Sequence, residues 1–430
     1  MSAREKAEST TVLTRSVAGF PRRFFGSLLT ALLLPALSQA ADDFGPVRLR
    51  PVSDWTSPLL SNDSARTRRT DDPPLDAPPR PVGGSANSYV LRQHAALARN
   101  GAPIVVVPWH TSYEDCTAVF YDERLHPLAT WRDALGEQVM NATDGDLDED
   151  GLPEILLTLR MWKPGVAVLH YDAERRELQT VWEYRRDTQG IFHRGSAIGQ
   201  FTASPGREAV FGSSRGELLL LDRHGKLLAN RVLDKQAVIQ RIDLIDVDAD
   251  GYDEMVIATG RSPGRVWLVR WNPESAELQV LWNRDVTPEG RGGDNCYEAV
   301  VHLQGHPDGG PAIAAATERE HDPQTGSILL LDLKGNIAWQ DVFAPADRRA
   351  GGCDFRDVTG DHVPEIVGRS TGPHKLVIYS NRGRRIGGIQ NCRTGSAGPC
   401  VIERLGRRSL LVATSQAYEI VPRDEQAKDK

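Results

Sequence analysis

Three short stretches of the sequence place carboxylates at alternate positions and then turn apolar. Counted from Asp146, the first stretch has acids at positions 1, 3, 5 and 9, and two later stretches repeat this spacing with few changes. Alternate residues of a tight loop can direct several oxygens at one point, and Ca²⁺ takes about 6–8 oxygen ligands. We therefore expect Ca²⁺ to be the cofactor of these loops. The candidate ligands are Asp146, Asp148, Asp150 and Glu154 in the first loop, Asp246, Asp248, Asp250 and Glu254 in the second, and Asp357, Thr359, Asp361 and Glu365 in the third.

These loops do not follow the EF-hand pattern, and the third one departs from the other two. An EF-hand needs a bidentate glutamate at position 12, where these stretches have Leu157, Ile257 and Gly368. Glycine at position 6 allows a sharp turn in the first two loops, but the third has His362 there and Thr359 at position 3. Acidic turns that are solvated without a metal remain the alternative, above all for the third loop.

The acidic stretches belong to a repeat of about fifty residues, which predicts the elements that position them. Short apolar runs typical of strands begin at Ile104, Ile155, Ala209, Met255, Ile313, Ile366 and Leu410. Each run is followed by a second strand-like segment and a polar turn, and the units end at Trp131, Trp182, Val232, Trp282, Trp339 and Ile389. Each unit therefore holds about four short strands, which predicts an all-β fold, a seven-bladed β-propeller of four-stranded blades. The large residue that ends most units is expected to pack between neighbouring blades.

The acidic pattern followed by a β-run resembles the FG-GAP or VCBS-type repeat, the calcium-binding blade of integrin α-subunit propellers and of many exported bacterial proteins. The resemblance covers residues 88–421 and is specific in the three acidic loops. It implies that the side chains at positions 1, 3, 5 and 9 bind Ca²⁺ together with a main-chain carbonyl at position 7, here Leu152, Tyr252 and Val363. Such calcium is expected to be structural rather than catalytic, because it neutralises carboxylates that would otherwise repel one another.

The seventh unit lacks its outer strand, and a segment near the N-terminus can supply it. "PVRLRPVSDW" is a strand-like segment that ends in Trp55, where other units also end in tryptophan. We expect residues 46–55 to pair with residues 417–421 and to close the ring. The predicted organisation is a signal peptide over 1–40, a closing strand within 41–57, a Pro-rich linker over 58–87, the propeller over 88–421 and a charged tail over 422–430.

The first forty residues read as an export signal. Arg22 and Arg23 precede an apolar run that ends at Ser38-Gln39-Ala40, a small-x-small cleavage pattern. The run is too short for a usual membrane span of about 20 apolar residues, although an uncleaved anchor is the alternative. We expect a periplasmic or secreted protein, with Sec and twin-arginine export both open. The net charge of −7 without a basic stripe argues against nucleic acid as a partner.

In an oxidising compartment, the five cysteines can form disulfides. Cys392 and Cys400 bracket a short polar loop and are expected to form a disulfide. Cys116, Cys296 and Cys353 remain, and the odd total leaves at least one thiol unpaired. Buried, inert thiols are the alternative for each of these three.

A ligand is expected on the rim opposite the acidic loops, where the other strand connections gather. Aromatic and basic side chains are typical of binding hot spots, and basic groups suit an anionic ligand such as a uronic acid or a carboxylate side chain. The partner predicted for this face is a carbohydrate or an envelope or extracellular protein. The candidate ligand-binding residues are Trp109, His110, Trp162, Lys163, His193, Arg194, Arg291 and Arg348, with Tyr113, Phe192 and His374 nearby.

No complete catalytic constellation is present in the sequence. There is no GxSxG nucleophile elbow between a strand and a helix, and HExxH and P-loop motifs are absent. His110 or His193 could act as a base beside Arg194, which would suit β-elimination from a uronate. At the level of fold the chain resembles the propeller-type rhamnogalacturonan lyases, which implies a polysaccharide lyase as the alternative function. We expect a binding or scaffold module in preference to an enzyme.

Overall fold

The computed structural model divides the chain into Met1–Ala41 and Asp42–Lys430, and every residue described here lies in the second unit. The described residues are 47–51, 92–96, 103–110, 116–121, 127–160, 162–172, 174–175, 177–187, 191, 193–261, 263–287, 294–319, 325–343, 350–370, 376–389, 400–404, 407–412 and 416–422. The predicted signal peptide, the linker, most of the charged tail, Cys392, Arg291 and Arg348 lie outside these residues. No helix in the described ranges is long and apolar enough to cross a membrane.

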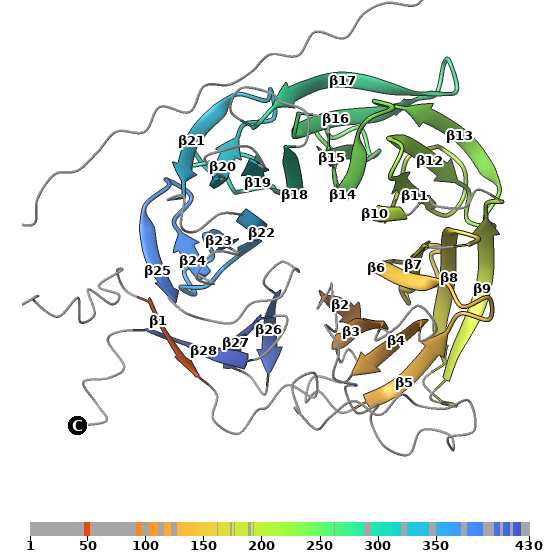
Figure 1. The fold of residues 1–430 in the computed structure, drawn as a ribbon, viewed down its shortest axis with the longest axis horizontal. Coiled ribbons are helices and arrows are strands. Elements are labelled where there is room, and N and C mark those ends of the chain that lie inside the picture. The colour runs from red at the N-terminus through yellow and green to blue at the C-terminus, as the bar shows by residue number, and fades with distance from the viewer. Residues whose placement is uncertain are drawn as a thin grey trace, which may run out of the picture. The chain divides into compact units, whose positions relative to one another are not determined.

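The described residues form an all-β fold of antiparallel sheets (Figure 1). One four-stranded sheet has the order β2 (Arg92–Ala96), β3 (Pro103–His110), β4 (Cys116–Tyr121) and β5 (Pro127–Arg132), and the next has the order β6 (Gln138–Gly145), β7 (Glu154–Arg160), β8 (Gly165–Asp172) and β9 (Glu177–Arg185). A third contains β10 (His193–Gly199), β11 (Glu208–Ser213), β12 (Glu217–Leu221) and β13 (Leu227–Val232).

The following strands continue the same up-and-down order. The strands β14 (Val238–Ile245), β15 (Glu254–Gly260), β16 (Arg265–Asn272) and β17 (Glu277–Asp285) form one set, and β18 (Asn295–His302), β19 (Ala312–Arg319), β20 (Thr325–Leu331) and β21 (Ile337–Val342) form another. A single residue pair, Gly260 with Asn295, joins these two sets. The next sheet contains β22 (Ala350–Arg356), β23 (Glu365–Ser370), β24 (Leu376–Tyr379) and β25 (Arg385–Ile389).

The last sheet combines both ends of the described chain. Its order is β1 (Val47–Pro51), β28 (Gln416–Pro422), β27 (Arg407–Val412) and β26 (Cys400–Arg404). Strand β1 runs antiparallel to β28, with Val47 opposite Pro422 and Pro51 opposite Tyr418.

The second strand of each central sheet contains an uninterrupted apolar run because both of its faces are buried. In β7, Ile155 and Leu157 pack with β4 and β5 of the preceding sheet, whereas Leu156 packs with β11 and β12 of the following one. Strand β15 divides its side chains between two neighbours in the same way. A strand covered on both faces has no reason to alternate apolar with polar residues. The fourth strands are mostly exposed and polar.

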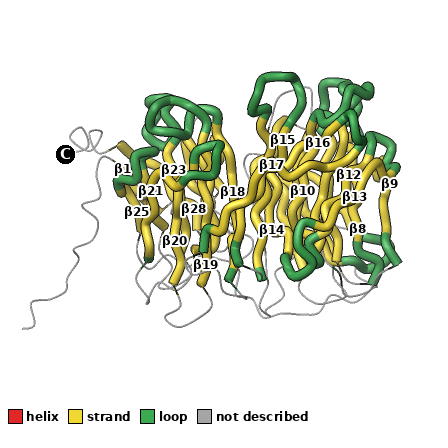
Figure 2. Tube along the Cα trace, turned by 90° about the horizontal axis from the view of Figure 1, so that it is seen from above, coloured by secondary structure: helices red, strands yellow, loops and turns green. Residues whose placement is uncertain are grey.

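Adjacent sheets meet along their first strands and are tied together at their outer turns. Strand β10 contacts β6 and β14, and β18 contacts β14 and β22, so that the sheets follow one another in chain order (Figure 1). Figure 2 shows the strands running between two loop-bearing rims. At the outer edge, the indole N–H groups of Trp182, Trp282 and Trp339 donate to the carbonyls of Arg223, Leu333 and Asn381 in the next sheet, at 2.8, 2.8 and 2.9 Å. These contacts confirm the predicted packing of the terminal tryptophans between sheets.

Candidate functional site

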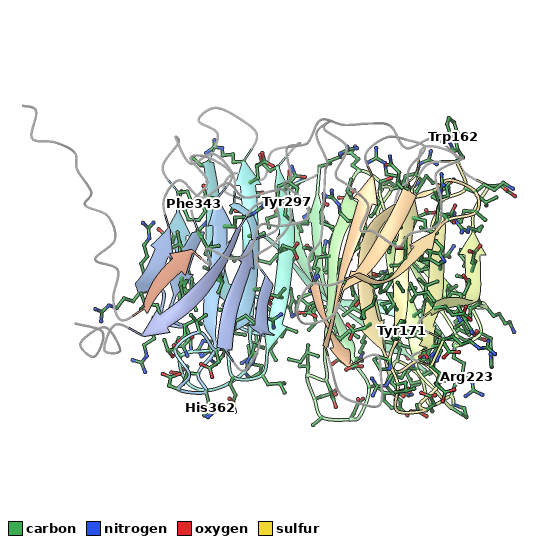
Figure 3. All side chains as sticks on the ribbon, turned by 90° about the horizontal axis from the view of Figure 1, so that it is seen from below. Trp162, Tyr171, Arg223, Tyr297, Phe343 and His362 are labelled. Atoms are coloured by element: carbon green, nitrogen blue, oxygen red, sulfur yellow. The ribbon has the colours of Figure 1, made fainter. Side chains whose placement is uncertain are left out.

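Each of the three acidic loops connects the first strand of a sheet to the second, as the sequence predicts. The loops lie between β6 and β7, between β14 and β15, and between β22 and β23, and the glutamate at position 9 begins the second strand. In an up-and-down sheet these connections share one rim with the turns between third and fourth strands. Figure 3 shows this arrangement, because His362 and Arg223 lie on one rim and Trp162 lies on the other.

The three loops share an unusual backbone with two residues in the left-handed region. At position 6 the φ angles are 87° for Gly151, 90° for Gly251 and 65° for His362. Position 4 is also left-handed, and there the third loop carries the glycine, Gly360, with φ of 87°. His362 therefore does not change the path of the loop, although a non-glycine residue is strained in this region.

Hydrogen bonds within the loops already occupy part of the carboxylates. The aspartate at position 1 accepts from the N–H of position 6 at 3.0–3.1 Å in all three loops. The aspartate at position 5 accepts from the N–H of position 7 at 2.8–2.9 Å. Oδ1 of Asp146, in contrast, is buried without a hydrogen-bond partner. Buried polar atoms nearly always have a partner, so this oxygen is a candidate for a ligand.

The glutamate at position 9 is a structural residue in four sheets, one more than the sequence analysis recognised. Glu154, Glu254 and Glu365 accept from the N–H of position 2 at 2.8, 2.8 and 2.6 Å. Glu208 makes the same bond to Phe201 at 2.9 Å in the loop "GQFTASPGRE", which lacks the aspartates. Glu208 stands directly before the apolar run that begins at Ala209, and this position could have identified it from the sequence. Burial raises the pKa of all four glutamates, and these N–H bonds lower it in part.

Position 3 separates the loops into two kinds. Thr359 donates from Oγ1 to Oε1 of Glu365 at 2.9 Å, and Thr202 makes the corresponding bond to Glu208. Asp148 and Asp248 occupy this position in the first two loops and raise the pKa of Glu154 and Glu254 further, after burial. A hydroxyl can close the loop with a hydrogen bond, whereas two carboxylates repel each other unless a cation or a proton lies between them.

The donor geometry fits a divalent cation in the first two loops. Carboxylate oxygens of Asp146, Asp148 and Glu154 lie within 4.8 Å of one another, and so do those of Asp246, Asp248 and Asp250. Oxygen-only sets of this kind suit Ca²⁺. In the third loop the described residues form no such group, and Thr359 and Glu365 are already bonded to each other.

On the opposite rim, two buried acids hold the loop that carries Trp162 and Lys163. Oε1 of Glu137 accepts from the N–H groups of Trp162 at 2.8 Å and Lys163 at 2.5 Å, and Glu137 is fully buried. Asp133 in turn accepts from the N–H groups of Leu135 and Glu137 at 2.9 and 2.8 Å. Trp162 remains 57% exposed, and Lys163 lies 3.5 Å from Asp187. Sequence reasoning found Trp162 and Lys163 but missed the acids that position them.

The remaining predicted ligand residues are only partly described. Arg194 lies inside the fold and donates to Oε1 of Gln240 on the neighbouring first strand at 2.5 Å, which ties two sheets together rather than pointing to a ligand. Trp109 and His110 lie in β3 and His193 begins β10, but their side chains lie outside the described part of the structure. The geometry therefore supports Trp162 and Lys163 more than Arg194.

The first strands also carry a set of charges that was not predicted. Nε of Arg241 in β14 lies 3.6 Å from Oε2 of Glu298 in β18. Burial raises the pKa of Glu298 to about 7, while Arg241 lowers it and Asp354 raises it. Cys296 and Cys353 are buried, free thiols beside this set, and burial raises the pKa of both. Their burial agrees with the inert-thiol alternative.

Comparison with known proteins supports the fold and no particular family. No family model matches the chain, and no curated protein matches it by sequence. Among solved structures, BBS1N in complex with ARL6DN aligns with 11% identity and a TM-score of 0.54 over 79% of this chain and 95% of the other. Sqt1 from Saccharomyces cerevisiae aligns with 11% identity and a TM-score of 0.51 over 79% of this chain and 97% of the other.

Both aligned structures are β-propellers, and the four-stranded sheets described above follow one another as propeller blades do. The chain has a β-propeller fold. The predicted all-β class, the four-stranded blades and the repeat are thereby confirmed. The propeller places the acidic loops on one rim and the Trp162 loop on the other (Figure 3).

Proposed function

We propose that this β-propeller is an exported, calcium-stabilised binding or scaffold module that holds a protein partner on the rim of Trp162. The observation that carries the proposal is an exposed tryptophan on a rigid support. The side chain of Trp162 is 57% exposed, whereas its backbone N–H donates to the fully buried carboxylate of Glu137. An exposed aromatic side chain on a loop whose backbone is held by a buried carboxylate is typical of an interface hot spot.

BBS1N, which shares the propeller fold, was crystallised in complex with ARL6DN. Identity of 11% carries the fold alone, so the partner class of this chain rests on its own residues. Lys163 and Asp187 place an exposed ion pair next to Trp162. Polar groups typically surround the apolar centre of a protein interface in this way.

Calcium in the first two loops is the second part of the proposal. Asp146, Asp148 and Glu154 would hold one ion, and Asp246, Asp248 and Asp250 would hold another. The spacing keeps its resemblance to the FG-GAP or VCBS-type repeat, and the unpartnered Oδ1 of Asp146 supports it. Bound Ca²⁺ would supply structural charge neutralisation. The third loop is proposed to work without metal, closed by Thr359 and Glu365.

A closed ring of seven blades is the third part. The pairing of β1 with β28 supports it, and β1 contacts β25 while β26 contacts β2. Export rests on the pattern of residues 22–40, and in an oxidising compartment the disulfide between Cys392 and Cys400 remains a prediction.

The binding proposal is tested by comparing the native chain with Trp162→Ala as baits in a periplasmic extract of the producing cell. Quantitative mass spectrometry is expected to show one or more proteins that the native chain captures and Trp162→Ala loses. Val181→Ser, which alters another apolar side chain of 52% exposure on β9, serves as the matched control and should retain them. Identical captures by the native chain and Trp162→Ala would refute this face as the binding site.

A further inference from the structure

The connection between β10 and β11, residues 200–207, is hydrogen-bonded to the acidic loop of the next blade. The N–H of Gln200 donates to Oδ2 of Asp253 at 2.9 Å, and the N–H of Asp253 donates to the carbonyl of Gln200 at 2.7 Å. Asp253 stands at position 8 of the second loop, between Tyr252 and Glu254. Strands β10 and β14, which lead into the two connections, lie side by side in adjacent blades (Figure 1). A pair of reciprocal hydrogen bonds therefore joins the two blades at this loop.

Asp253 has no counterpart in the other two acidic loops. Position 8 is Pro153 in the first loop and Pro364 in the third, and proline has neither an N–H to donate nor a carboxylate. The backbone of β10 leaves room for the Asp253 side chain, because a Cβ at Gly199 would lie 2.6 Å from Oδ2 of Asp253. Among the three loops, reciprocal bonding of this kind is thus a property of the second.

The 200–207 connection is closed without any of the aspartates. Glu208 accepts from the N–H groups of Phe201 and Thr202 at 2.9 and 3.3 Å, and from the hydroxyl of Thr202. Phe201 is 1% exposed and belongs to the same core cluster as Met255, the second residue of β15. The connection is therefore a support that is held by its own hydrogen bonds and by packing.

The bonds to Gln200 fix the peptide unit that carries the carbonyl of Tyr252. This carbonyl belongs to the same planar, trans peptide as the N–H of Asp253, so it points away from Gln200. It is the main-chain oxygen that the resemblance to the calcium-binding repeat implies as a ligand. Carboxylate oxygens of three other aspartates of this loop, and not those of Asp253, lie within 4.8 Å of one another. Asp253 therefore stands behind the candidate ligands rather than among them.

We propose that Asp253 is a positioning residue for the cation of the second loop, so that the blade of β10–β13 takes part in cation binding although it supplies no ligand. This role rests on the calcium proposed for the second loop. Removal of a residue that orients the ligands of a metal typically weakens metal affinity about 10–100-fold. Because coupling between two sites is reciprocal, a cation in the second loop should in turn strengthen the bonds between Gln200 and Asp253.

Calcium titration against a chromophoric chelator tests the proposal in full chains that carry Asp148→Ala, which leaves the second loop as the binding loop. Adding Asp253→Ala should weaken calcium affinity at least about tenfold. Asp253→Asn is the matched control, because it removes the same charge but keeps an oxygen that can accept from Gln200, and it should retain most of the affinity. Equal losses in both variants would overturn the proposal, since charge alone would explain them. Equal affinity of Asp253→Ala and the parent chain would overturn it as well.

Hydrogen exchange followed by mass spectrometry measures the reciprocal effect and does not require Asp253→Ala to fold. In the Asp148→Ala chain, Ca²⁺ should slow exchange in residues 199–203, because opening of the bond to Asp253 becomes rarer. The turn of residues 222–226 in the same blade is the control and should exchange at an unchanged rate. Unchanged exchange in residues 199–203 with the ion bound, or equal slowing in both segments, would overturn the proposal. An Asp148→Ala chain that binds no calcium would instead refute the calcium site of the second loop, and this role of Asp253 with it.

Discussion

The hydroxyl of Thr359 donates a 2.9 Å hydrogen bond to Oε1 of Glu365 and closes the third acidic loop from within. The same pair recurs as Thr202 and Glu208 in a loop without aspartates. Asp148 and Asp248 stand at this position in the other two loops and have no proton to donate when ionised. The residue at position 3 therefore distinguishes loops that are closed by this hydrogen bond from loops that carry a second carboxylate in its place.

Replacing the residue at position 3 should convert a loop proposed to bind Ca²⁺ into one that is closed by a hydrogen bond. Asp248→Thr is expected to remove one bound Ca²⁺ per chain and to leave the loop closed through Glu254, because threonine restores the donor seen in the third loop. Elemental analysis of dialysed protein measures the ion, and the thermal midpoint in EGTA measures the closure. Asp248→Ala, the matched control, should lose the ion without gaining this closure. An unchanged ion count in both variants would contradict the prediction.

Calcium removal should destabilise the native chain. A ligand that binds only the folded state adds to stability by linkage, about 2.7 kcal/mol at a hundredfold excess over Kd. EGTA should therefore lower the thermal midpoint, and added Ca²⁺ should restore it. Asp148→Ala and Asp248→Ala should each reduce the calcium stoichiometry by about one ion. A midpoint indifferent to EGTA, in protein free of calcium, would exclude the metal.

The contact between Trp182 and the next blade should not tolerate a methyl group at Gly225. This glycine has φ of 80°, and a Cβ there would lie 2.8 Å from Cε3 of Trp182. Gly225→Ala should lower the free energy of unfolding by about 2–5 kcal/mol, from left-handed strain of about 1–2 kcal/mol and overpacking of about 1–3 kcal/mol.

Gly309→Ala is the matched control, because it measures the left-handed backbone strain without the overpacking that is expected for Gly225→Ala. Gly309 has φ of 84° and nothing within 4 Å of its added Cβ, so this variant carries only the backbone cost. Urea unfolding of both variants gives the difference. Equal destabilisation would show that Trp182 has room to move.

Stability should fall as the pH rises through the range in which Glu298 ionises. Burial raises the pKa of Glu298 from 4.5 to about 7 in the folded protein, although Arg241 and Arg194 oppose the shift. The folded state therefore keeps a proton that the unfolded chain releases between these values, and the free energy of unfolding declines with pH over this interval. Glu298 keeps 22% of its side chain exposed, so the decline should be shallower than for a fully buried acid.

Glu298→Gln should flatten this decline by up to about 3 kcal/mol between pH 5 and pH 8. Urea unfolding at several pH values measures it. Asp308→Asn changes an acid with an 88% exposed side chain and is the control, which should keep the native slope. A Glu298→Gln profile parallel to that of the native chain would contradict the assignment.

Loss of the N-terminal strand should destabilise the whole propeller. Strand β1 pairs along its length with β28, and an unpaired edge would be left in its absence. Deletion of residues 41–57 should lower the thermal midpoint and promote aggregation, whereas deletion of 62–82 should be tolerated. Size-exclusion chromatography and thermal unfolding compare the two. Equal stability of both deletions would show that the ring does not need this strand.

Local patterns in the sequence were sufficient for the fold and for the position of the acidic loops. The repeat of about fifty residues is visible because the second strands of successive described blades are buried on both faces, as in β7 and β15. The alternate acids of the loop at Asp146 are visible because neighbouring residues form the whole cluster. The repeat and the acidic loops depend on residues that lie close together in the sequence, so both can be recognised from the order of residues alone.

Only the tertiary structure decided which side chains serve as supports and which stay exposed. In the sequence, nothing distinguishes Glu137 from the other acids. In the structure, the backbone N–H of Trp162, twenty-five residues later, donates a hydrogen bond to its carboxylate. Arg241 and Glu298 approach each other because β14 and β18 belong to adjacent blades. Contacts between distant segments follow from the packing of the blades against one another, and no local spacing of residues encodes them.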